Sequence, residues 1–169
     1  MRSSFPARGT RRLDTAADTR AFGEELGRAL QAGDVVILEG PLGAGKTTLT
    51  QAIAAGLGVR GRVTSPTFVI AREHRSTVGG PTLVHVDAYR LLGEGSSGDP
   101  LGELDALDLD TELLDAVVVA EWGGGLVEQI TEEYLFIHLD RETAVREDPD
   151  PEARIFTWEL RSPGLPDQV

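Results

Sequence analysis

Residues 35–48 read Val35-Val36-Ile37-Leu38-Glu39-Gly40-Pro41-Leu42-Gly43-Ala44-Gly45-Lys46-Thr47-Thr48, and this stretch decides the fold. The first four residues form a continuous apolar run, which is typical of a strand buried on both faces of a sheet. Residues 40–47 fit the pattern G-x-x-x-x-G-K-[ST], whose glycines let backbone N–H groups close around phosphate oxygens. The residues from Lys46 to Leu57 favour a helix, so the glycine-rich turn joins a buried strand to a helix N-terminus. The stretch therefore predicts a phosphate-binding loop.

Three residues at the end of this loop carry side chains suited to a bound nucleotide. Lys46 offers a point charge to the β- and γ-phosphates, Thr47 offers a hydroxyl to Mg²⁺, and Thr48 lies on the α-phosphate side. Lys46 is the only lysine in the chain, whereas the other 15 basic residues are arginine. A compact ammonium fits a tight phosphate cradle that a planar guanidinium would overfill.

The rest of the chain predicts one α/β domain with a central mixed sheet of about seven strands in a three-layer P-loop NTPase-like arrangement. Residues 1–12 hold four arginines and no apolar periodicity, so we expect a basic disordered tail, followed by the domain over 13–161 and a frayed tail over 162–169. Asp14 or Thr15 should cap a helix that runs to Leu30. Short acidic helices are expected within 102–115. The expected later strands are Thr67–Ala71, Leu83–Val86, Val117–Ala120, Tyr134–Leu139 and Ile155–Leu160, with a hairpin loop over 76–81.

Two of the expected strands end in an acid. Asp87 follows one apolar run and Glu121 follows another. A phosphate-loop enzyme needs a carboxylate at a neighbouring strand end for Mg²⁺ or its water shell, and Glu121 is the first choice for the metal. Asp87 would orient water or support the metal. His85 shares a face with Asp87, and a packed or hydrogen-bonded role is favoured for it over metal binding.

Two other features leave alternatives open. Trp122, beside Glu121, could pack beneath the site or stack on a ligand. Ser65-Pro66-Thr67 could be a hydroxyl pair that senses the γ-phosphate or Mg²⁺, or an ordinary turn.

Composition excludes several classes of protein. The chain of 169 residues has no cysteine, so it holds no disulfide scaffold, thiolate metal site or cysteine nucleophile. Its N-terminus lacks an apolar signal region, and no apolar run approaches the ~18 residues of a spanning helix, which predicts a cytoplasmic protein with no membrane association. The net charge is −12, and residues 94–152 hold 18 acids against two arginines. Such a chain repels phosphate backbones, so direct tRNA binding is not expected.

The motifs together resemble the TsaE (YjeE) family of bacterial phosphate-loop ATPases. The match covers about residues 13–160 and includes three later motifs in family order and spacing as well as the phosphate loop. The matching segments are Thr19 with Phe22-Gly23, residues 40–48, Ser65-Pro66-Thr67-Phe68, His85-Val86-Asp87-Ala88-Tyr89-Arg90 and Glu121-Trp122. Pro41, where the family commonly has Asp, and the segment 93–100 depart from its pattern.

The resemblance implies a function that the residues alone do not give. It implies an ATPase that uses ATP and Mg²⁺ and binds a TsaD–TsaB pair, which makes N6-threonylcarbamoyladenosine at position 37 of tRNAs that read codons starting with A. The tRNA would be met only through that complex. By resemblance, Thr47 and Glu121 bind the metal, and Lys46, Asp87 and Glu121 are catalytic. The nucleotide contacts implied are Leu42, Gly43, Ala44, Gly45, Lys46, Thr47 and Thr48, the switch residues Ser65 and Thr67, Trp122, and more loosely Thr15 and Arg154.

Two other functions are weighed against this one. A small-molecule kinase usually closes an arginine-rich lid over its phosphates, whereas residues 94–115 hold eight acids and no arginine. A non-hydrolytic module, in which nucleotide only sets affinity for a partner, would have the same sequence features. A GTPase is disfavoured because its guanine-reading Asn-Lys-x-Asp motif needs an asparagine, and the chain has none.

Overall fold

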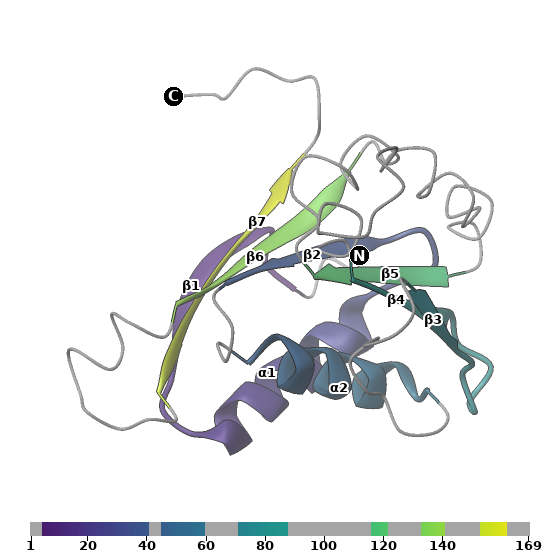
Figure 1. Cartoon of the computed structure of the whole chain (residues 1–169), viewed down its shortest axis with the longest axis horizontal. Coiled ribbons are helices and arrows are strands. Elements are labelled where there is room, and N and C mark those ends of the chain that lie inside the picture. Colours follow the sequence, from purple (N-terminus) through teal and green to yellow (C-terminus); the bar gives the residue numbers. More distant parts are fainter. Residues whose placement is uncertain are drawn as a thin grey trace, which may run out of the picture.

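One mixed sheet organises the molecule, and its strands follow the order β1-β7-β6-β2-β5-β4-β3 (Figure 1). The computed structural model describes residues 5–40, 45–59, 71–87, 116–121, 133–140 and 153–161. The seven strands within these ranges confirm the sheet expected from the sequence. Their bounds are β1 Arg8–Leu13, β2 Val35–Glu39, β3 Ala71–His74, β4 Thr82–Asp87, β5 Ala116–Glu121, β6 Tyr134–Asp140 and β7 Arg154–Arg161.

The four inner strands are parallel, and antiparallel strands flank them. β2 pairs in parallel with β5 and β6, and β4 pairs in parallel with β5. β7, β1 and β3 are added by antiparallel pairing. The inner strands β2 and β5 are buried almost throughout, as continuous apolar runs require. Parallel strands end at one edge of the sheet, so the ends of β2, β4, β5 and β6 lie on the same side of the molecule.

Both described helices, α1 (Ala16–Ala29) and α2 (Lys46–Leu57), cover the same face of the sheet (Figure 1). The acidic helices expected over 102–115 lie outside the described residues, and so does any third layer built from them. Neither helix in the described ranges is long and apolar enough to cross a membrane.

The ends of the helices follow from local chemistry. Thr15 caps α1: its side chain accepts from the Asp18 N–H, and the Asp18 carboxylate accepts from the Thr15 N–H, which is a complete capping box. α2 ends at Gly58, whose φ of 72° is accessible to glycine at little cost. Both helices therefore occupy the expected residues.

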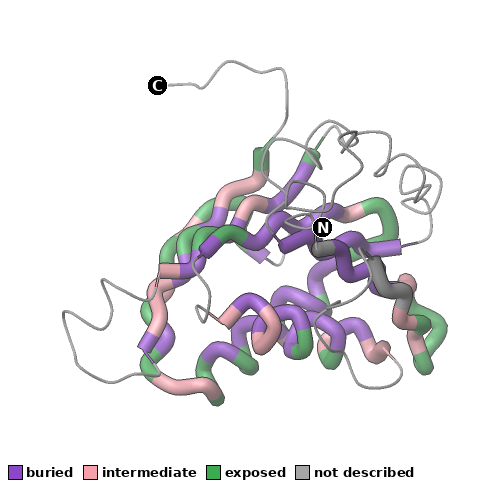
Figure 2. The backbone as a smooth tube through the Cα atoms, in the orientation of Figure 1, coloured by how far each residue is buried: buried purple, intermediate pink, exposed green. Residues whose placement is uncertain are grey.

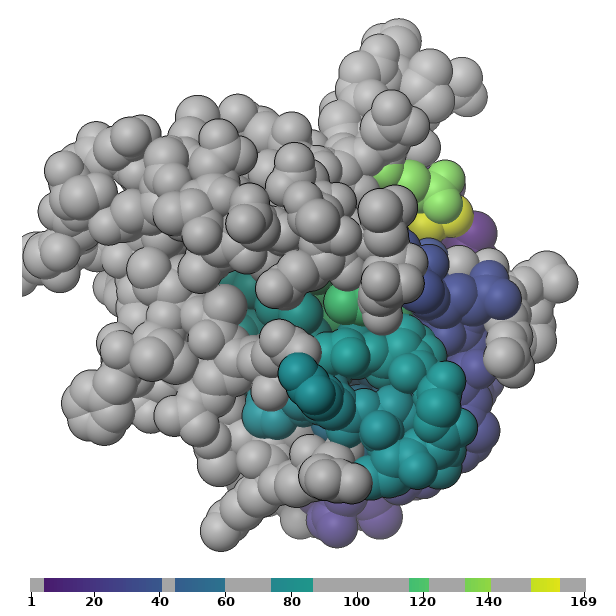
Figure 3. Space-filling view, turned by 90° about the vertical axis from the view of Figure 1, so that its right-hand side faces the viewer, coloured from purple at the N-terminus to yellow at the C-terminus, as the bar shows by residue number. Residues whose placement is uncertain are grey.

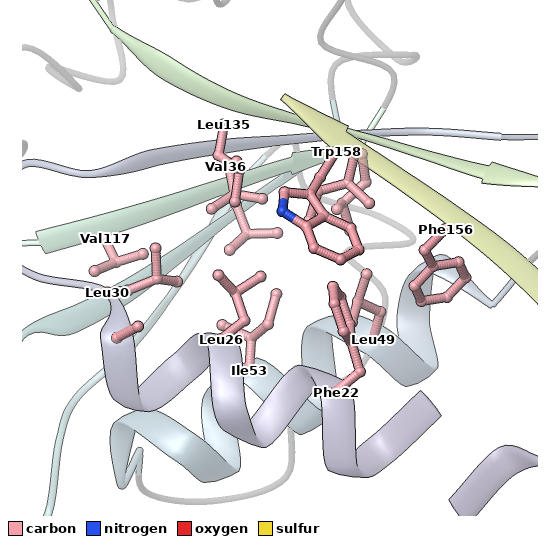
Figure 4. Packing of buried hydrophobic residues seen from close by; sticks show 14 of the residues in the cluster. Phe22, Leu26, Leu30, Val36, Leu49, Ile53, Val117, Leu135, Phe156 and Trp158 are labelled. Carbon is pink, nitrogen blue, oxygen red and sulfur yellow. The ribbon is translucent and has the colours of Figure 1, made fainter. Parts of the chain in front are cut away.

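The core fills the space between the helices and the sheet (Figures 2 and 4). Phe22 and Leu26 of α1 and Ile53 of α2 point toward the sheet, and Trp158 of β7 points back between them. The two helices approach closely because glycines lie at their contact. A Cβ on Gly27 would lie 2.3 Å from the Ile53 carbonyl oxygen, so this position tolerates no side chain without a shift of the helices.

The expectation of a disordered tail over 1–12 is wrong for residues 5–12. β1 pairs with β7 along its whole length, Phe5 is buried, and the Trp158 indole donates to the Pro6 carbonyl oxygen at 3.0 Å. Gly9 lies against the Trp158 ring, so a Cβ there would come within 2.4 Å of it. This strand has little apolar periodicity that could be recognised in the sequence. Its contacts are with Trp158 and β7, about 150 positions later in the chain. The domain therefore includes residues before 13.

The β3–β4 hairpin only partly matches its prediction. The expected strand over 67–71 shares Ala71 with β3, and its other residues lie outside the described ranges. The hairpin connection before β4 is confirmed. The Ser76 and Thr77 hydroxyls donate to the Gly58 carbonyl oxygen at 3.4 and 3.0 Å, which ties the turn to the end of α2. Figure 3 shows this hairpin (teal) on the side of the molecule that lies to the right in Figure 1.

Candidate phosphate-binding site

The start of α2 is arranged differently from the start of α1. Its N-cap is Gly45 with a φ of 104°, and no side chain within the described part of the chain caps it. The first turn, Lys46-Thr47-Thr48, contains no acid. A helix N-terminus presents backbone N–H donors and a partial positive charge. At α1 a capping box supplies a side-chain acceptor, whereas at α2 no described side chain accepts from these donors.

The ammonium of Lys46 lies at this helix start. The side chain is 7% exposed, and its Nζ donates to the Gly40 carbonyl oxygen at 2.6 Å, across the turn. Burial of an ammonium costs free energy unless strong acceptors surround it. At this position Lys46 adds its positive charge to that of the helix N-terminus. A helix N-terminus with an added positive charge is a suitable binding site for phosphate groups. Thr47 and Thr48 follow it and are half-buried.

Glu121 lies at the same edge and on the same face of the sheet. The β2–β5 register sets Glu121 beside Leu38, two residues before Gly40. Leu38 and Val119 belong to the core beneath α1 and α2, and side chains two apart on a strand share a face. The Glu121 carboxylate is therefore on the helix-bearing face, close to where the chain leaves β2 for α2. Only 4% of this residue is exposed.

His85 of β4 is the neighbour of Glu121. Its Nε2 lies 3.6 Å from Glu121 Oε1, and the ring is completely buried. The sequence predicted a packed or hydrogen-bonded histidine, and the complete burial of the ring agrees with this prediction. Its closeness to Glu121 could not be predicted, since it depends on the register between β4 and β5, which pairs His85 with Val119.

Asp87 ends β4 opposite Glu121 in the same register. The two strand-end acids that the sequence singled out are thus adjacent in the sheet. The backbone of Asp87 is described and its side chain is not, so its role as the second acid stays a prediction.

Arg154 and Thr15 also lie at this edge of the sheet, at β7 and β1, which are two and three strands from β2. Arg154 begins β7 and pairs with Leu13 at the end of β1, just before Thr15. The hydroxyl of Thr15 serves the α1 cap, and the Arg154 guanidinium donates to the Ala153 carbonyl oxygen at 2.8 Å. Their expected contact with a nucleotide stays a prediction.

The remaining site residues expected from the sequence lie outside the described ranges. They are Leu42, Gly43, Ala44, Ser65, Thr67 and Trp122. The expected residues whose placement at this edge is described are Gly45, Lys46, Thr47, Thr48, Glu121, the backbone of Asp87, Thr15 and Arg154.

The fold and this site define a P-loop NTPase-like domain: a parallel inner sheet, a buried strand, a glycine turn with lysine, and a helix start that no side chain caps in the described residues. A family model described as threonylcarbamoyl adenosine biosynthesis protein TsaE matches residues 13–148. The chain belongs to the TsaE family.

Individual relatives agree with this membership. The chain is 50% identical over 158 residues to a tRNA threonylcarbamoyladenosine biosynthesis protein TsaE of Mycobacterium bovis, covering 93% of this chain and 90% of that protein. A Streptomyces coelicolor protein of the same name is 57% identical over 122 residues, or 72% of this chain and 78% of that protein. The crystal structure of Bacillus subtilis YdiB matches with a TM-score of 0.66 and 29% identity, covering 92% of this chain and 86% of that one.

Proposed function

We propose that this chain binds ATP with Mg²⁺ at the start of α2 and hydrolyses it in support of a TsaD–TsaB complex. That complex would form N6-threonylcarbamoyladenosine at position 37 of tRNAs that read codons starting with A. The family membership and the names of the relatives support the pathway. The geometry of the site supports the binding of a nucleotide.

One observation carries the proposal. The buried ammonium of Lys46 lies at a helix start that no described side chain caps, at the sheet edge where Glu121 also lies. Backbone N–H groups and one ammonium supply the donors for phosphate oxygens. A carboxylate on the same face supplies the hard oxygen ligand that Mg²⁺ prefers.

The residues present fit a magnesium ion. The Glu121 carboxylate is buried, and its Oε1 has no hydrogen-bond partner among the described residues, so the hydrogen bonds described there do not fully compensate its charge and a cation would stabilise it. Thr47 and Glu121 would hold the ion, and the bound ion would neutralise charge on the β- and γ-phosphate oxygens. Lys46 would hold those phosphates in place from the other side. Asp87, next to Glu121 in the sheet, would orient the attacking water.

Slow hydrolysis by the chain alone is part of the proposal. Phosphoryl transfer without an arginine at the leaving phosphates is slow, and an arginine supplied by a partner adds about 10³–10⁵ in rate. The Arg154 guanidinium lies at the same edge of the sheet as the start of α2, but it donates to the Ala153 carbonyl oxygen. Docking of TsaD–TsaB would complete or order the site.

The test is ATP hydrolysis by the chain alone, with tRNA, and with the TsaD–TsaB complex of the same organism. We expect weak turnover alone, no response to tRNA, and a clear rise with TsaD–TsaB. Vigorous turnover alone with no response to the partners would contradict an accessory ATPase. Appearance of labelled phosphate on a small acceptor would instead indicate a kinase.

A further inference from the structure

His85 is the most completely buried polar ring in the described part of the chain, and nothing described satisfies it. Its exposure is 0%, and neither Nδ1 nor Nε2 has a hydrogen-bond partner among the described residues. A neutral imidazole carries one N–H donor and one acceptor, and leaving both without partners inside a protein costs free energy. A leucine would fill the same space without that cost, so simple packing does not account for a histidine at this position.

A second orphaned atom lies beside it. Glu121 Oε1 is buried without a hydrogen-bond partner among the described residues, and His85 Nε2 is 3.6 Å from it. This separation is just beyond a hydrogen bond, so a small rotation of either side chain would close it. A hydrogen bond from His85 Nε2–H to Glu121 Oε1 would give both buried atoms a partner.

The sheet fixes this pair in place. β4 and β5 pair in parallel over six residues, and the register sets His85 beside Val119, two residues before Glu121 on the same face. Both strands are buried around the pair: Val86, Val119 and Ala120 are each 0% exposed. The ring therefore has little freedom to turn away, and it can hold the carboxylate in a single orientation.

We propose that His85 is a positioning residue for Glu121. Its Nε2–H donates to Oε1, and this bond directs the other carboxylate oxygen, Oε2, toward the ion that accompanies the nucleotide. Carboxylates that bind metals are commonly fixed by such outer hydrogen bonds, and loss of the outer partner typically lowers metal affinity about 10- to 100-fold. The inference rests on the proposed function, because it gives Glu121 an ion to hold.

Three substitutions separate positioning from packing. His85→Gln keeps an N–H donor near the position of Nε2, His85→Asn moves that donor to the position of Nδ1, and His85→Leu keeps the volume without a donor. Each variant is titrated with Mn²⁺ in the presence of saturating nucleotide, and bound metal is read by electron paramagnetic resonance. Nucleotide affinity in EDTA and thermal melting are measured beside it.

We expect His85→Leu and His85→Asn to lose about tenfold or more in Mn²⁺ affinity, with nucleotide affinity in EDTA unchanged. His85→Gln should recover most of the loss. Wild-type Mn²⁺ affinity in a folded, nucleotide-binding His85→Leu would overturn the positioning role alone. Failure of the wild-type chain to bind nucleotide would overturn the proposed function and this role with it.

A measurement on the wild-type chain decides the matter even where the variants do not fold. The chain has three histidines, so long-range ¹H–¹⁵N spectra of the rings are simple to assign. We expect the His85 ring to carry a proton on Nε2, and its Nε2 resonance to move when Mg²⁺ is added to the nucleotide-bound protein. A ring protonated on Nδ1 only, or one unmoved by Mg²⁺, would overturn the assignment.

Discussion

Glu121 is a buried carboxylate for which we propose a ligand. It ends an all-apolar strand, 4% of it is exposed, and one of its oxygens has no hydrogen-bond partner within the described ranges. A carboxylate in such surroundings is destabilising unless a cation or a donor reaches it. The sequence pattern of four apolar residues followed by an acid predicted its place at a strand end, and the β2–β5 register adds that it lies on the face of the phosphate loop.

The substitution Glu121→Gln should damage Mg²⁺-dependent hydrolysis more than nucleotide binding. In the proposed site backbone N–H groups would hold most of the phosphate oxygens and Glu121 would act through the ion, so we expect kcat to fall about 100-fold while ATP affinity in EDTA stays within about twofold. Steady-state phosphate release with TsaD–TsaB and fluorescent-nucleotide titration measure the two effects. Asp87→Asn serves as the comparison. If it abolishes hydrolysis and Glu121→Gln does not, the roles of the two acids are reversed.

At the scale of elements, the glycines between α1 and α2 determine how the helices sit on the sheet. Gly23 lies against Ala52, and Gly27 lies against the backbone of Ile53 and Gly56. The position of α2, and with it the loop at its start, depends on this close approach. Spacing along the sequence predicted both helices, but the glycines that join them drew no prediction, because contact between helices is a tertiary property.

Gly27→Ala should therefore destabilise the domain although alanine is the better helix former. We expect the free energy of unfolding to fall by about 1–3 kcal/mol, as for other overpacked sites, measured by urea denaturation. At exposed Ala21 of the same helix, Ala21→Gly should cost about 1 kcal/mol from helix propensity alone. A Gly27→Ala protein more stable than the wild type would show that the helices can separate without cost.

The outer strand β1 gives a prediction about pH. The Arg8 guanidinium donates to Glu159 of β7 at 3.0 Å, and this hydrogen bond is the main cause that lowers the pKa of Glu159 below its ordinary value. A lowered folded-state pKa stabilises the protein above the unfolded-state pKa, and this contribution is lost as the pH falls through the folded-state value. Both side chains are exposed, so the contribution is small.

Arg8→Ala should raise the pKa of Glu159 toward its ordinary value without restoring it fully, because Arg161 lies 3.6 Å from the same carboxylate. The measurement is an NMR titration that follows the chemical shift of the Glu159 side-chain carboxyl carbon with pH. An unchanged pKa would show that the Arg8 contact is not populated in solution.

For the whole molecule, the sequence predicted the inner part of the fold well and its outer parts less well. The buried runs that became β2 and β5 carry their signal locally, and so do the capped start of α1 and the glycine end of α2. β1 was missed because Gly9 lies against Trp158 and the whole strand pairs with β7, which is distant in the sequence. The contact of His85 with Glu121 was missed for the same reason: it depends on strand register.

The charge of the whole chain gives a prediction about its affinity for tRNA. With a net charge of −12 and 18 acids against two arginines in residues 94–152, direct binding to tRNA is electrostatically opposed. We expect no shift of tRNA in native gels by this chain at physiological salt, and a shift when TsaD–TsaB is present. Micromolar binding of tRNA by the chain alone would contradict this.

In the proposed function Lys46 and the start of α2 bind the phosphates of ATP, and every later step depends on this binding. Isothermal titration calorimetry of the full chain with ATP and Mg²⁺ tests it, with Lys46→Ala compared against the wild type. Arg28→Ala, which removes one exposed positive charge from α1, is the matched control. We predict ATP binding by the wild type and by Arg28→Ala, and none, or binding weakened at least about 100-fold, by a folded Lys46→Ala. Equal ATP affinity in all three proteins would contradict the assignment of the phosphate loop.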